Sequence, residues 1–538
     1  MKDKVYEMFQ SLSANTGNYV VYYEKGKRIV KTFAALSADI DACIGRLASL
    51  DPAGKTIALC GPVSYYWMVI DLACIKGGYY SIAIPETFDD AEFARSVSEA
   101  DILLLDYSMR HRRHDFRECY LFNCGEDGAV RRFDDVPVSA GIPRENLVRE
   151  QYGIAFTSGT SGVSKKIKLF FPQPATGGNK KQGVLKRLKT LYRYKSGFWS
   201  RKDNRLIIFM PFSHLQQRTF ALFALMRKIN IILSNPADCI RHIVIEKPNI
   251  MISVPVFYEV LARRIEEKLE RLPAGSRYAM AVFNFLGIHS WSNRNLLKKI
   301  WSSLLFRDIR RIYGGRADYF ITGSAPIRRE VLHTFYRIGV KVFEAYGQSE
   351  ATVIAMNTEK HFRIGSVGKP GPNIRVSEEG EILLKYNEAK HGYNRDVLQV
   401  KDGYIHTGDA GYIDDDGFLF LLGRIDDVIV LGNGKKIFPE NIEQKFRRYE
   451  AIKQAVVFCN RHQKLSLVIE PAKKPRSASF EEIIREVNNG LPAYERITEY
   501  IESTEPFTAE NGLLTASFKI KRKQVIHNYA SQTFIPVP

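Results

Sequence analysis

The chain has 538 residues, of which 45% are hydrophobic, 12% aromatic and 25% charged. These proportions support a large globular core and exclude a disordered, collagen-like or low-complexity chain. The length predicts about three or four folding units. The 78 Lys and Arg residues exceed the 59 Asp and Glu residues by 19 charges, which favours anionic partners: nucleotides, nucleic acid, lipid headgroups or an acidic protein.

The cysteines and the N-terminus indicate an intracellular protein without a zinc ribbon. None of the seven cysteines forms a C-x-x-C pair. The first residues mix charged and aromatic side chains and lack the apolar core of a secretory signal, so we expect a cytoplasmic protein. The most apolar internal stretch, 279–287, is interrupted by Asn284 and is shorter than the roughly 20 residues of a spanning helix. Any membrane contact is therefore expected to be peripheral.

The first two thirds of the chain alternate short apolar runs with segments of helical spacing. This alternation is typical of parallel α/β sheets. The expected strands are residues 56–60, 102–105, 120–122, 152–156, 205–210, 229–233, 250–254 and 319–322, and residues 67–75 have helical spacing.

After about residue 363 the pattern changes to Gly-rich hairpins, at 380–384, 403–406 and 417–421, which predict a small β-barrel-like subdomain over about 363–424. From residue 426 the pattern is again mixed, with helices expected at 439–448 and 479–491. The predicted fold class is therefore α/β: an N-terminal domain of parallel-sheet subdomains plus the β subdomain, residues 1–424, and a small α+β C-terminal domain, residues 425–538.

The strand at 152–156 leads into a loop with the chemistry of a polyphosphate cradle. Residues 157–166 read TSGTSGVSKK. Glycines allow the backbone to bend around an anion, hydroxyls donate to its oxygens, and lysines add positive charge. The G-x-x-x-x-G-K-[ST] spacing of a Walker loop is absent. Taken alone, the segment is equally well explained as a solvated Ser/Gly turn.

This loop resembles the phosphate-binding signature T-S-G-T-[TS]-G-x-P-K-G of the adenylate-forming superfamily, which contains acyl-CoA synthetases, luciferases and nonribosomal adenylation domains. Ser164 stands where proline is usual and Lys166 where glycine is usual. The resemblance implies that phosphate is bound by Thr157, Ser158, Gly159, Thr160, Ser161, Gly162 and Lys165.

Further segments match the superfamily's nucleotide motifs in the right order. Residues 344–350, EAYGQSE, resemble the Y-G-x-T-E segment, which implies adenine stacking by Tyr346, an α-phosphate contact from Ser349 and Mg²⁺ binding by Glu350. A flat apolar ring and a hard carboxylate oxygen suit these roles. The same resemblance implies nucleotide contacts from Gly323, Ser324, Ala325, Pro326, Ala345, Gly347 and Gln348.

The last motifs lie towards the C-terminus. Residues 407–409 match T-G-D, which implies that Asp409 accepts from the ribose hydroxyls. Residues 423–427 match G-R-x-[DK]-D, which implies a ribose or phosphate contact from Arg424 and a hinge at Asp426. Residues 514–522 resemble the L-T-P-T-x-K-x-[KR]-R motif, which implies that Lys519 is the catalytic lysine.

The resemblance covers about residues 50–530 and implies an activity. Family members use ATP and Mg²⁺ to convert a carboxylate to an acyl-adenylate, with release of pyrophosphate, and then transfer the acyl group to a thiol, most often CoA. The chemistry would fall to Lys519, Glu350 and Thr160, and the C-terminal domain would turn about its hinge between the two reactions.

The segment 211–219, PFSHLQQRT, resembles the L-P-L-S-H-x-x-E-R segment of long-chain acyl-CoA synthetases, with Gln217 in place of the usual glutamate. No acid is present to bind a substrate ammonium, which disfavours an amino acid. His214 and Val254 are substrate-pocket candidates. Because the chain is short for a long-chain enzyme, the expected substrate is a fatty, medium-chain, aryl or other apolar acid.

Two basic segments leave the thiol acceptor open. Residues 179–205 contain ten Lys/Arg and one Asp, with amphipathic spacing at 184–191, and residues 262–311 are also basic. They could dock the acidic carrier protein that bears a phosphopantetheine thiol, or an anionic membrane face. A nucleic-acid-binding protein lacks support because no nucleic-acid module accompanies the charge. A noncatalytic nucleotide sensor is disfavoured by the joint presence of Glu350, Asp409, Arg424 and Lys519. The oligomeric state is left open.

Overall fold

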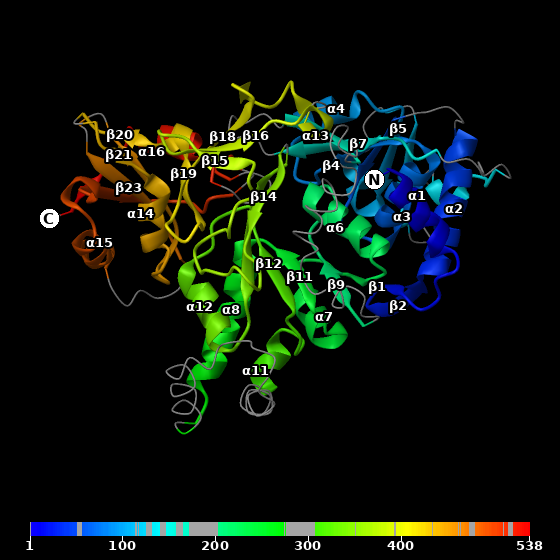
Figure 1. Ribbon diagram of the computed structural model, residues 1–538, viewed down its shortest axis with the longest axis horizontal. Coiled ribbons are helices and arrows are strands. Elements are labelled where there is room, and N and C mark those ends of the chain that lie inside the picture. The colour runs from blue at the N-terminus through cyan, green and yellow to red at the C-terminus, as the bar shows by residue number, and fades with distance from the viewer. Residues whose placement is uncertain are drawn as a thin grey trace.

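A computed structural model of the chain is shown in Figure 1. It describes residues 2–50, 56–112, 116, 118–124, 132–139, 147–157, 165–171, 203–273, 275, 307–349, 351–391, 394–432, 434–460, 462, 464–472, 479–508, 511–514 and 520–537.

Two mainly parallel sheets form the larger part of the molecule. The first has the order β14-β13-β12-β11-β9-β10-β1-β2, and the second has the order β6-β5-β3-β4-β7-β8. The first consists of β1 (Tyr19–Glu24), β2 (Lys27–Thr32), β9 (Arg205–Ile208), β10 (Asn230–Leu233), β11 (Ile250–Ser253), β12 (Tyr319–Thr322), β13 (Val342–Gln348) and β14 (Thr352–Met356). The second consists of β3 (Thr56–Cys60), β4 (Tyr80–Ile84), β5 (Ile102–Asp106), β6 (Cys119–Phe122), β7 (Gln151–Thr157) and β8 (Lys165–Phe170).

A layer of helices separates these sheets. α2 (Phe33–Leu50), α3 (Tyr65–Gly77) and α6 (Leu215–Met226) share one hydrophobic core with the facing sides of both sheets, and α1 (Lys2–Leu12) packs on this core too. α3 is buried nearly all round because it has a sheet on either side. Its ends are defined by the Ser64 side chain, which accepts from Trp67 N, and by Gly78, whose φ of 76° closes the C-terminus.

Further helices cover the outer faces of the sheets. α7 (Cys239–Glu246), α8 (Pro255–Glu270), α11 (Arg307–Ile312) and α12 (Arg329–Arg337) pack on the first sheet, and α4 (Asp90–Val97) packs on the second. The result is a five-layer αβαβα arrangement, which confirms the predicted α/β fold class. Two features were not predicted from the sequence: β1 and β2 complete the first sheet, and β8 and β14 are antiparallel edge strands.

A third sheet follows the two large ones. It joins β15 (Ile374–Val376), β16 (Glu381–Lys385), β17 (Val400–Lys401), β18 (Tyr404–Ile413) and β19 (Leu419–Arg424), with the short helix α13 (Glu388–His391) between β16 and β17. These antiparallel strands occupy the region where the sequence predicts Gly-rich hairpins. β13, which belongs to the first large sheet, packs Tyr346 into the core of this third sheet.

The C-terminal part has its own sheet and two cores. β22 (Ile452–Cys459), β23 (Leu465–Pro471), β24 (Glu499–Glu502) and β25 (Ile535–Pro536) form the sheet, and β20 (Ile429–Val430) and β21 (Lys436–Ile437) form a hairpin before it. α14 (Pro439–Phe446) and α15 (Phe480–Asn489) share one core with this sheet, and α16 (Arg522–Tyr529) shares the other. Both α14 and α15 end two residues before the predicted positions; Gly490 follows α15.

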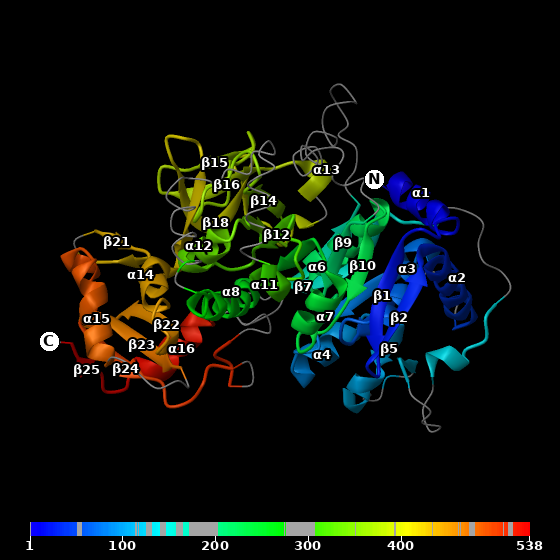
Figure 2. The same cartoon turned by 90° about the horizontal axis from the view of Figure 1, so that it is seen from below.

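Within the described residues, few polar contacts join the C-terminal part to the larger part. Arg448 Nε lies 3.1 Å from Glu330 Oε1, and Arg328 Nη1 donates to Arg447 O at 2.8 Å. α2 and α15 lie towards opposite ends of the long axis in both views (Figures 1 and 2). Among the helices of the described residues, none is long and apolar enough to cross a membrane.

Candidate nucleotide-binding site

Three side chains from two strands, β13 and β19, converge on Asp409 of β18. Tyr346 Oη donates to Asp409 Oδ2 at 2.6 Å, and Gln348 Nε2 donates to the same oxygen at 2.7 Å. Arg424 Nη1 donates to Asp409 Oδ1 at 2.9 Å. β13, β18 and β19 therefore bring together three motifs that the sequence separates by up to 78 residues, from Tyr346 to Arg424.

The backbone conformation of the T-G-D segment, which lies within β18, explains its glycine. Gly408 has a φ of 68°, and a Cβ there would lie 2.5 Å from Arg424 Nη2. Any larger residue would therefore displace the guanidinium that pairs with Asp409. Arg424 and Gln348 also both donate to the carbonyl oxygen of Thr407, at 2.9 and 2.6 Å, which holds this part of β18 against β13 and β19.

The protein donors already occupy much of the Asp409 carboxylate. Two ionised oxygens offer about four accepting positions, and three of them face Tyr346, Gln348 and Arg424. Burial, followed by the nearby Asp409, raises the pKa of Tyr346, so its phenol stays protonated and continues to donate. A ribose hydroxyl can use the remaining position on Oδ1, whereas a second hydroxyl must displace one protein donor from Oδ2.

The segment after β12 runs close to β13. A Cβ on Gly323 would lie 2.9 Å from Ala345 O, so only glycine allows this approach. Ser324 has a φ of 71°, a left-handed conformation that is strained for a residue other than glycine. Its hydroxyl donates to Gln216 Oε1 at 3.2 Å. Strain held by a specific contact beside the nucleotide motifs is consistent with the predicted adenine pocket.

A buried carboxyl lies two residues before Tyr346. Glu344 is 9% exposed, and its Oε2 accepts from Gly365 N at 2.8 Å. Burial raises the pKa of Glu344 to about 8, against the smaller lowering effects of the Gly365 amide and the Arg329 guanidinium. Glu344 therefore holds a proton at neutral pH and ties the nucleotide strand β13 to the turn at Gly365.

This proton predicts a pH-dependent stability. Between about pH 4.5 and pH 8 the unfolded chain ionises Glu344 while the folded chain keeps it protonated, so the free energy of unfolding should fall as pH rises, by up to a few kcal/mol. Glu344→Gln keeps an acceptor for Gly365 N and removes the titration. We expect urea unfolding of the variant to lose this component of the pH dependence; an unchanged difference between pH 5 and pH 8 would contradict the assignment.

The segment resembling the long-chain motif leads into α6. His214 is the residue before the helix, and Gln217 Nε2 donates to Ile252 O at 3.3 Å. Arg218 is 1% exposed, and its Nε donates to Asp71 Oδ2 at 2.8 Å, so a buried ion pair joins α6 to α3. Val254 immediately precedes α8 at the carboxyl end of β11. Both substrate-pocket candidates therefore lie where β-strands of the first sheet end, and their roles stay predictions.

The other predicted catalytic elements are only partly described. β7 and β8 form an antiparallel pair in which Thr157 and Lys165 are partners, so the two ends of the phosphate loop lie together. Residues 158–164 between them, Glu350 and Lys519 lie outside the described residues. Ser349 is described at the end of β13, next to Glu350 in the chain.

The predicted hinge lies at the junction of β19 with the C-terminal part. Asp426 is in a short 3₁₀ turn, 425–427, and its Oδ2 lies 3.6 Å from Arg424 Nη2. Arg424 thus contacts both the nucleotide motif and the hinge. Within the described ranges no group of three His, Cys, Asp or Glu side chains could hold a metal ion. The single carboxylate of Glu350 fits Mg²⁺ only if ATP oxygens and water supply the other ligands, as Mg²⁺ commonly requires.

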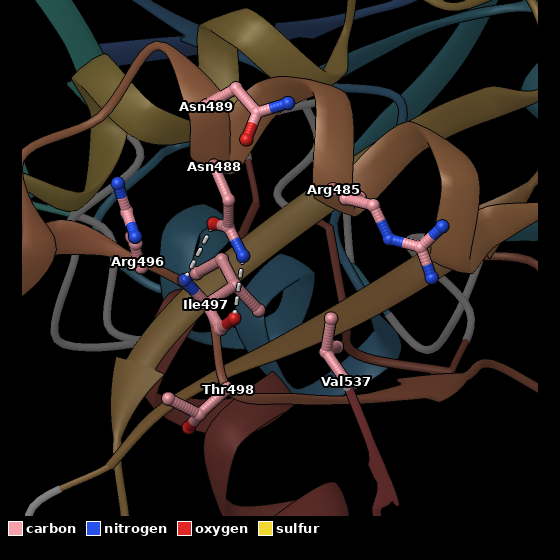
Figure 3. A pocket seen from close by; sticks show the side chains of 7 residues that line it. All are labelled: Arg485, Asn488, Asn489, Arg496, Ile497, Thr498 and Val537. Atoms are coloured by element: carbon pink, nitrogen blue, oxygen red, sulfur yellow. Dashed lines mark hydrogen bonds between the residues drawn. The ribbon is translucent and has the colours of Figure 1, made fainter.

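A hollow of about 260 Å³ lies away from these motifs, between α15 and β24 (Figure 3). Arg485 and Arg496 extend to opposite sides of it. The side chain of Asn488 is bonded to Ile497 N and O at 2.9 and 2.8 Å, so it fixes the chain before β24. Because the two arginine side chains do not converge on the hollow, we interpret it as a gap where α15 packs against the chain before β24, and not as a binding site.

The residues that support the site without a predicted nucleotide contact of their own were not identified from the sequence. Gln216, Glu344 and the Arg218–Asp71 pair are examples. Glu344 and Arg218 stand inside quoted motifs, and an ionisable residue among apolar neighbours was the available signal. Asp71, in the apolar helix α3, is likewise an ionisable residue among apolar neighbours, but the sequence does not indicate that it pairs with Arg218.

Comparisons with known proteins agree with this architecture. Residues 9–381 match the family described as AMP-binding enzyme, and residues 426–533 match the AMP-binding enzyme C-terminal domain. The solved o-succinylbenzoate-CoA synthetase MenE of Bacillus subtilis superposes with a TM-score of 0.71 at 18% identity, covering 97% of each chain. The adenylation domain of a carboxylate reductase of Mycobacterium chelonae gives 0.72 at 16% identity, covering 98% of this chain and 89% of that one.

Curated relatives match over most of their length. Long-chain-fatty-acid–CoA ligase FadD15 of Mycobacterium bovis is 26% identical over 98% of this chain and 96% of its own. Long-chain-fatty-acid–CoA ligase 5 of the mouse is 25% identical over 87% of this chain and 78% of its own. Fold, motifs and matches together define an adenylate-forming enzyme. The chain belongs to the AMP-binding enzyme family.

Proposed function

We propose that this enzyme is an AMP-forming acid–thiol ligase. It activates an apolar carboxylic acid with ATP to an acyl-adenylate, releases pyrophosphate, and transfers the acyl group to the thiol of CoA. The convergence of Tyr346, Gln348 and Arg424 on Asp409 carries this proposal, because the geometry joins motifs that resemble the adenine, ribose and hinge segments of adenylating enzymes.

The site's groups suit the chemistry of adenylation. A carboxylate reacts poorly with a thiol because oxide is a poor leaving group, and AMP replaces it. The acid's oxygen attacks the α-phosphorus, and the bond to pyrophosphate breaks. Lys519 and the donors of residues 157–165 would stabilise charge on the transferring phosphate, and Lys519 would also bind the acid's carboxylate. Mg²⁺ held by Glu350 would neutralise phosphate charge.

Rotation of the C-terminal part would separate the two reactions. The few polar contacts that join it to the larger part, Arg448 with Glu330 and Arg328 with Arg447, can exchange with water at small cost because they are exposed or half-buried. Asp426, beside Arg424, is the proposed pivot. Such a movement would withdraw Lys519 and admit the thiol.

The similarity to long-chain-fatty-acid–CoA ligases supports an apolar acid, and the segment 211–219 has no carboxylate to bind an ammonium group. An acyl carrier protein is the second candidate acceptor, because carrier proteins are acidic and residues 179–205 carry ten basic groups against one acid. The same basic segment would also suit peripheral contact with an anionic membrane.

Two substitutions separate the contribution of the Tyr346 ring from that of its hydroxyl. Tyr346→Phe keeps the ring and removes one donor to Asp409, so we expect stability to fall by about 1 kcal/mol while the KM for ATP changes less than about threefold. Tyr346→Ala also removes the stacking surface, and we expect its KM to rise about tenfold or more. A larger KM effect in the phenylalanine variant than in the alanine variant would contradict stacking.

Hydroxylamine trapping tests the proposed function. The enzyme is incubated with ATP, Mg²⁺ and hydroxylamine across a panel of fatty, aryl and amino acids, and the hydroxamates are measured. We expect products from apolar acids, followed by thioesters when CoA replaces hydroxylamine. Activity confined to amino acids would overturn the substrate assignment. If thioesters form only with a carrier protein, the carrier protein and not CoA is the acceptor.

A further inference from the structure

A cavity of about 260 Å³ lies between α2, α3 and β1, near the end of the molecule opposite α15 (Figures 1 and 2). None of its lining residues belongs to the nucleotide or acid motifs. Its walls are Tyr22, Lys31, Asp39, Ala42, Cys43, Arg46, Tyr65, Tyr66, Val69, Ile70, Phe122, Phe133 and Asp134. The volume suits a molecule of about one ring and excludes a nucleotide or a long acyl chain.

Aromatic and aliphatic side chains form most of the cavity wall. The rings of Tyr22 and Tyr65 stack at 4.6 Å between centroids with 7° between their planes. Val69, Phe122 and Phe133 are all buried and line the same cavity. A flat ring placed against these surfaces would be removed from water, which favours an aromatic ligand.

Some of the charged groups around the cavity have hydrogen-bond partners within the described ranges and one does not. Asp39 Oδ2 accepts from Lys31 Nζ at 3.0 Å and from Tyr65 Oη at 2.7 Å, so these three groups satisfy one another. Arg46 Nε, in contrast, is buried and has no hydrogen-bond partner among the residues that the structure describes. A buried donor without an acceptor is costly, and a ligand that brings an anionic oxygen would relieve that cost. The carboxylate of Asp134, at the exposed edge, also lines the cavity and repels an anion, so Arg46 is the group that has to hold the ligand's negative charge.

From these groups we infer a second small-molecule site that binds an aromatic monocarboxylate. The ring packs among Tyr22, Val69 and Phe133, and the carboxylate accepts from Arg46. The site is separate from acid activation and does not depend on the proposed function.

The cavity has a structural route to the acid motif through α3. Tyr65, Val69 and Ile70 of α3 line the cavity, whereas Trp67 stacks on Phe212, a residue of the 211–219 segment, at 5.0 Å between centroids. A ligand in the cavity therefore contacts the helix that supports this segment. A ligand bound in the cavity could therefore affect the 211–219 segment through α3.

Binding of benzoate to the full-length protein tests the inference, with benzamide as the uncharged ligand of the same shape. The measurements are made with a saturating unreactive acyl-adenylate analogue, so that the nucleotide and acid site is filled. We expect Arg46→Gln to weaken benzoate at least about tenfold and to remove its advantage over benzamide. Ala42→Phe, which fills the cavity from α2, should weaken both ligands.

Arg263→Gln is the matched control, because it removes one exposed charge on α8 far from the cavity lining. It should bind benzoate like the wild type. ATP–pyrophosphate exchange should be unchanged in Arg46→Gln, which separates this test from that of the proposed function. Absence of benzoate binding to the wild type, or unchanged binding in Arg46→Gln, would overturn the inference.

Discussion

Lys519→Ala should abolish acid-dependent ATP–pyrophosphate exchange, by about 10²- to 10³-fold, while leaving thioester formation from a supplied acyl-adenylate nearly intact. The reason is that Lys519 is proposed to bridge two anions, the acid's carboxylate and the α-phosphate, which must approach before the phosphorus–oxygen bond forms. Without its charge they repel each other. The second reaction starts from an acyl–phosphate bond already made, so no carboxylate anion has to approach the phosphate, and under the proposed rotation the C-terminal part would then have turned away.

Lys521→Ala provides the matched control for this test. Lys521 lies two residues further on, where its backbone N donates to Leu513 O at 2.9 Å before α16. Removal of its side chain takes away the same charge without touching the proposed bridge, so exchange should remain within about threefold of wild type. Survival of exchange in Lys519→Ala, or equal loss in both variants, would show that the lysine has been assigned wrongly.

Asp409→Asn should raise the KM for ATP on the order of 100-fold. One amide oxygen replaces two charged oxygens, and the amide NH₂ faces donors from Tyr346 and Gln348 or from Arg424. Charge-assisted bonds of this kind contribute about 1.5–3 kcal/mol each. The variant should also unfold at a lower urea concentration, because the half-buried Arg424 loses its closest charged partner and keeps only its contacts with Thr407 O and the more distant Asp426.

Asp415→Asn is the comparison variant for Asp409→Asn. Asp415 is exposed in the turn that joins β18 to β19, so it lies on the same hairpin but outside the site. Its KM and stability should equal those of the wild type within about twofold. If Asp409→Asn keeps the wild-type KM for ATP at reduced stability, Asp409 stabilises the contacts of β18 with β13 and β19 and does not bind the nucleotide.

Much of the fold could be predicted because the apolar runs of buried strands are local signals. The run at residues 56–60 became β3 with the same bounds, and residues 319–322 became β12. The pairing of β1 with β10 could not be foreseen. It joins Val20 to Ile231 across more than 200 residues, and a strand's own sequence does not specify its neighbour.

In the candidate nucleotide site, too, the sequence identifies residues but not the contacts between them. Tyr346, Asp409 and Arg424 could be named from motifs, because each motif keeps its residue types together along the chain. Their mutual hydrogen bonds could not, since the bonds depend on how β13 meets the third sheet. Burial of Glu344 is a further example: the sequence shows only a carboxyl two residues before Tyr346, and its packing is what indicates that it is protonated.

Transfer of oxygen from the acid to AMP tests the central claim most directly. The enzyme is given an apolar acid labelled with ¹⁸O in both carboxylate oxygens, together with ATP and CoA, and the AMP is analysed by mass spectrometry. If the carboxylate attacks the α-phosphorus and the thiol then displaces AMP, each AMP carries one ¹⁸O. Thioester formation with unlabelled AMP, or with the label in ADP or phosphate, would contradict an acyl-adenylate intermediate.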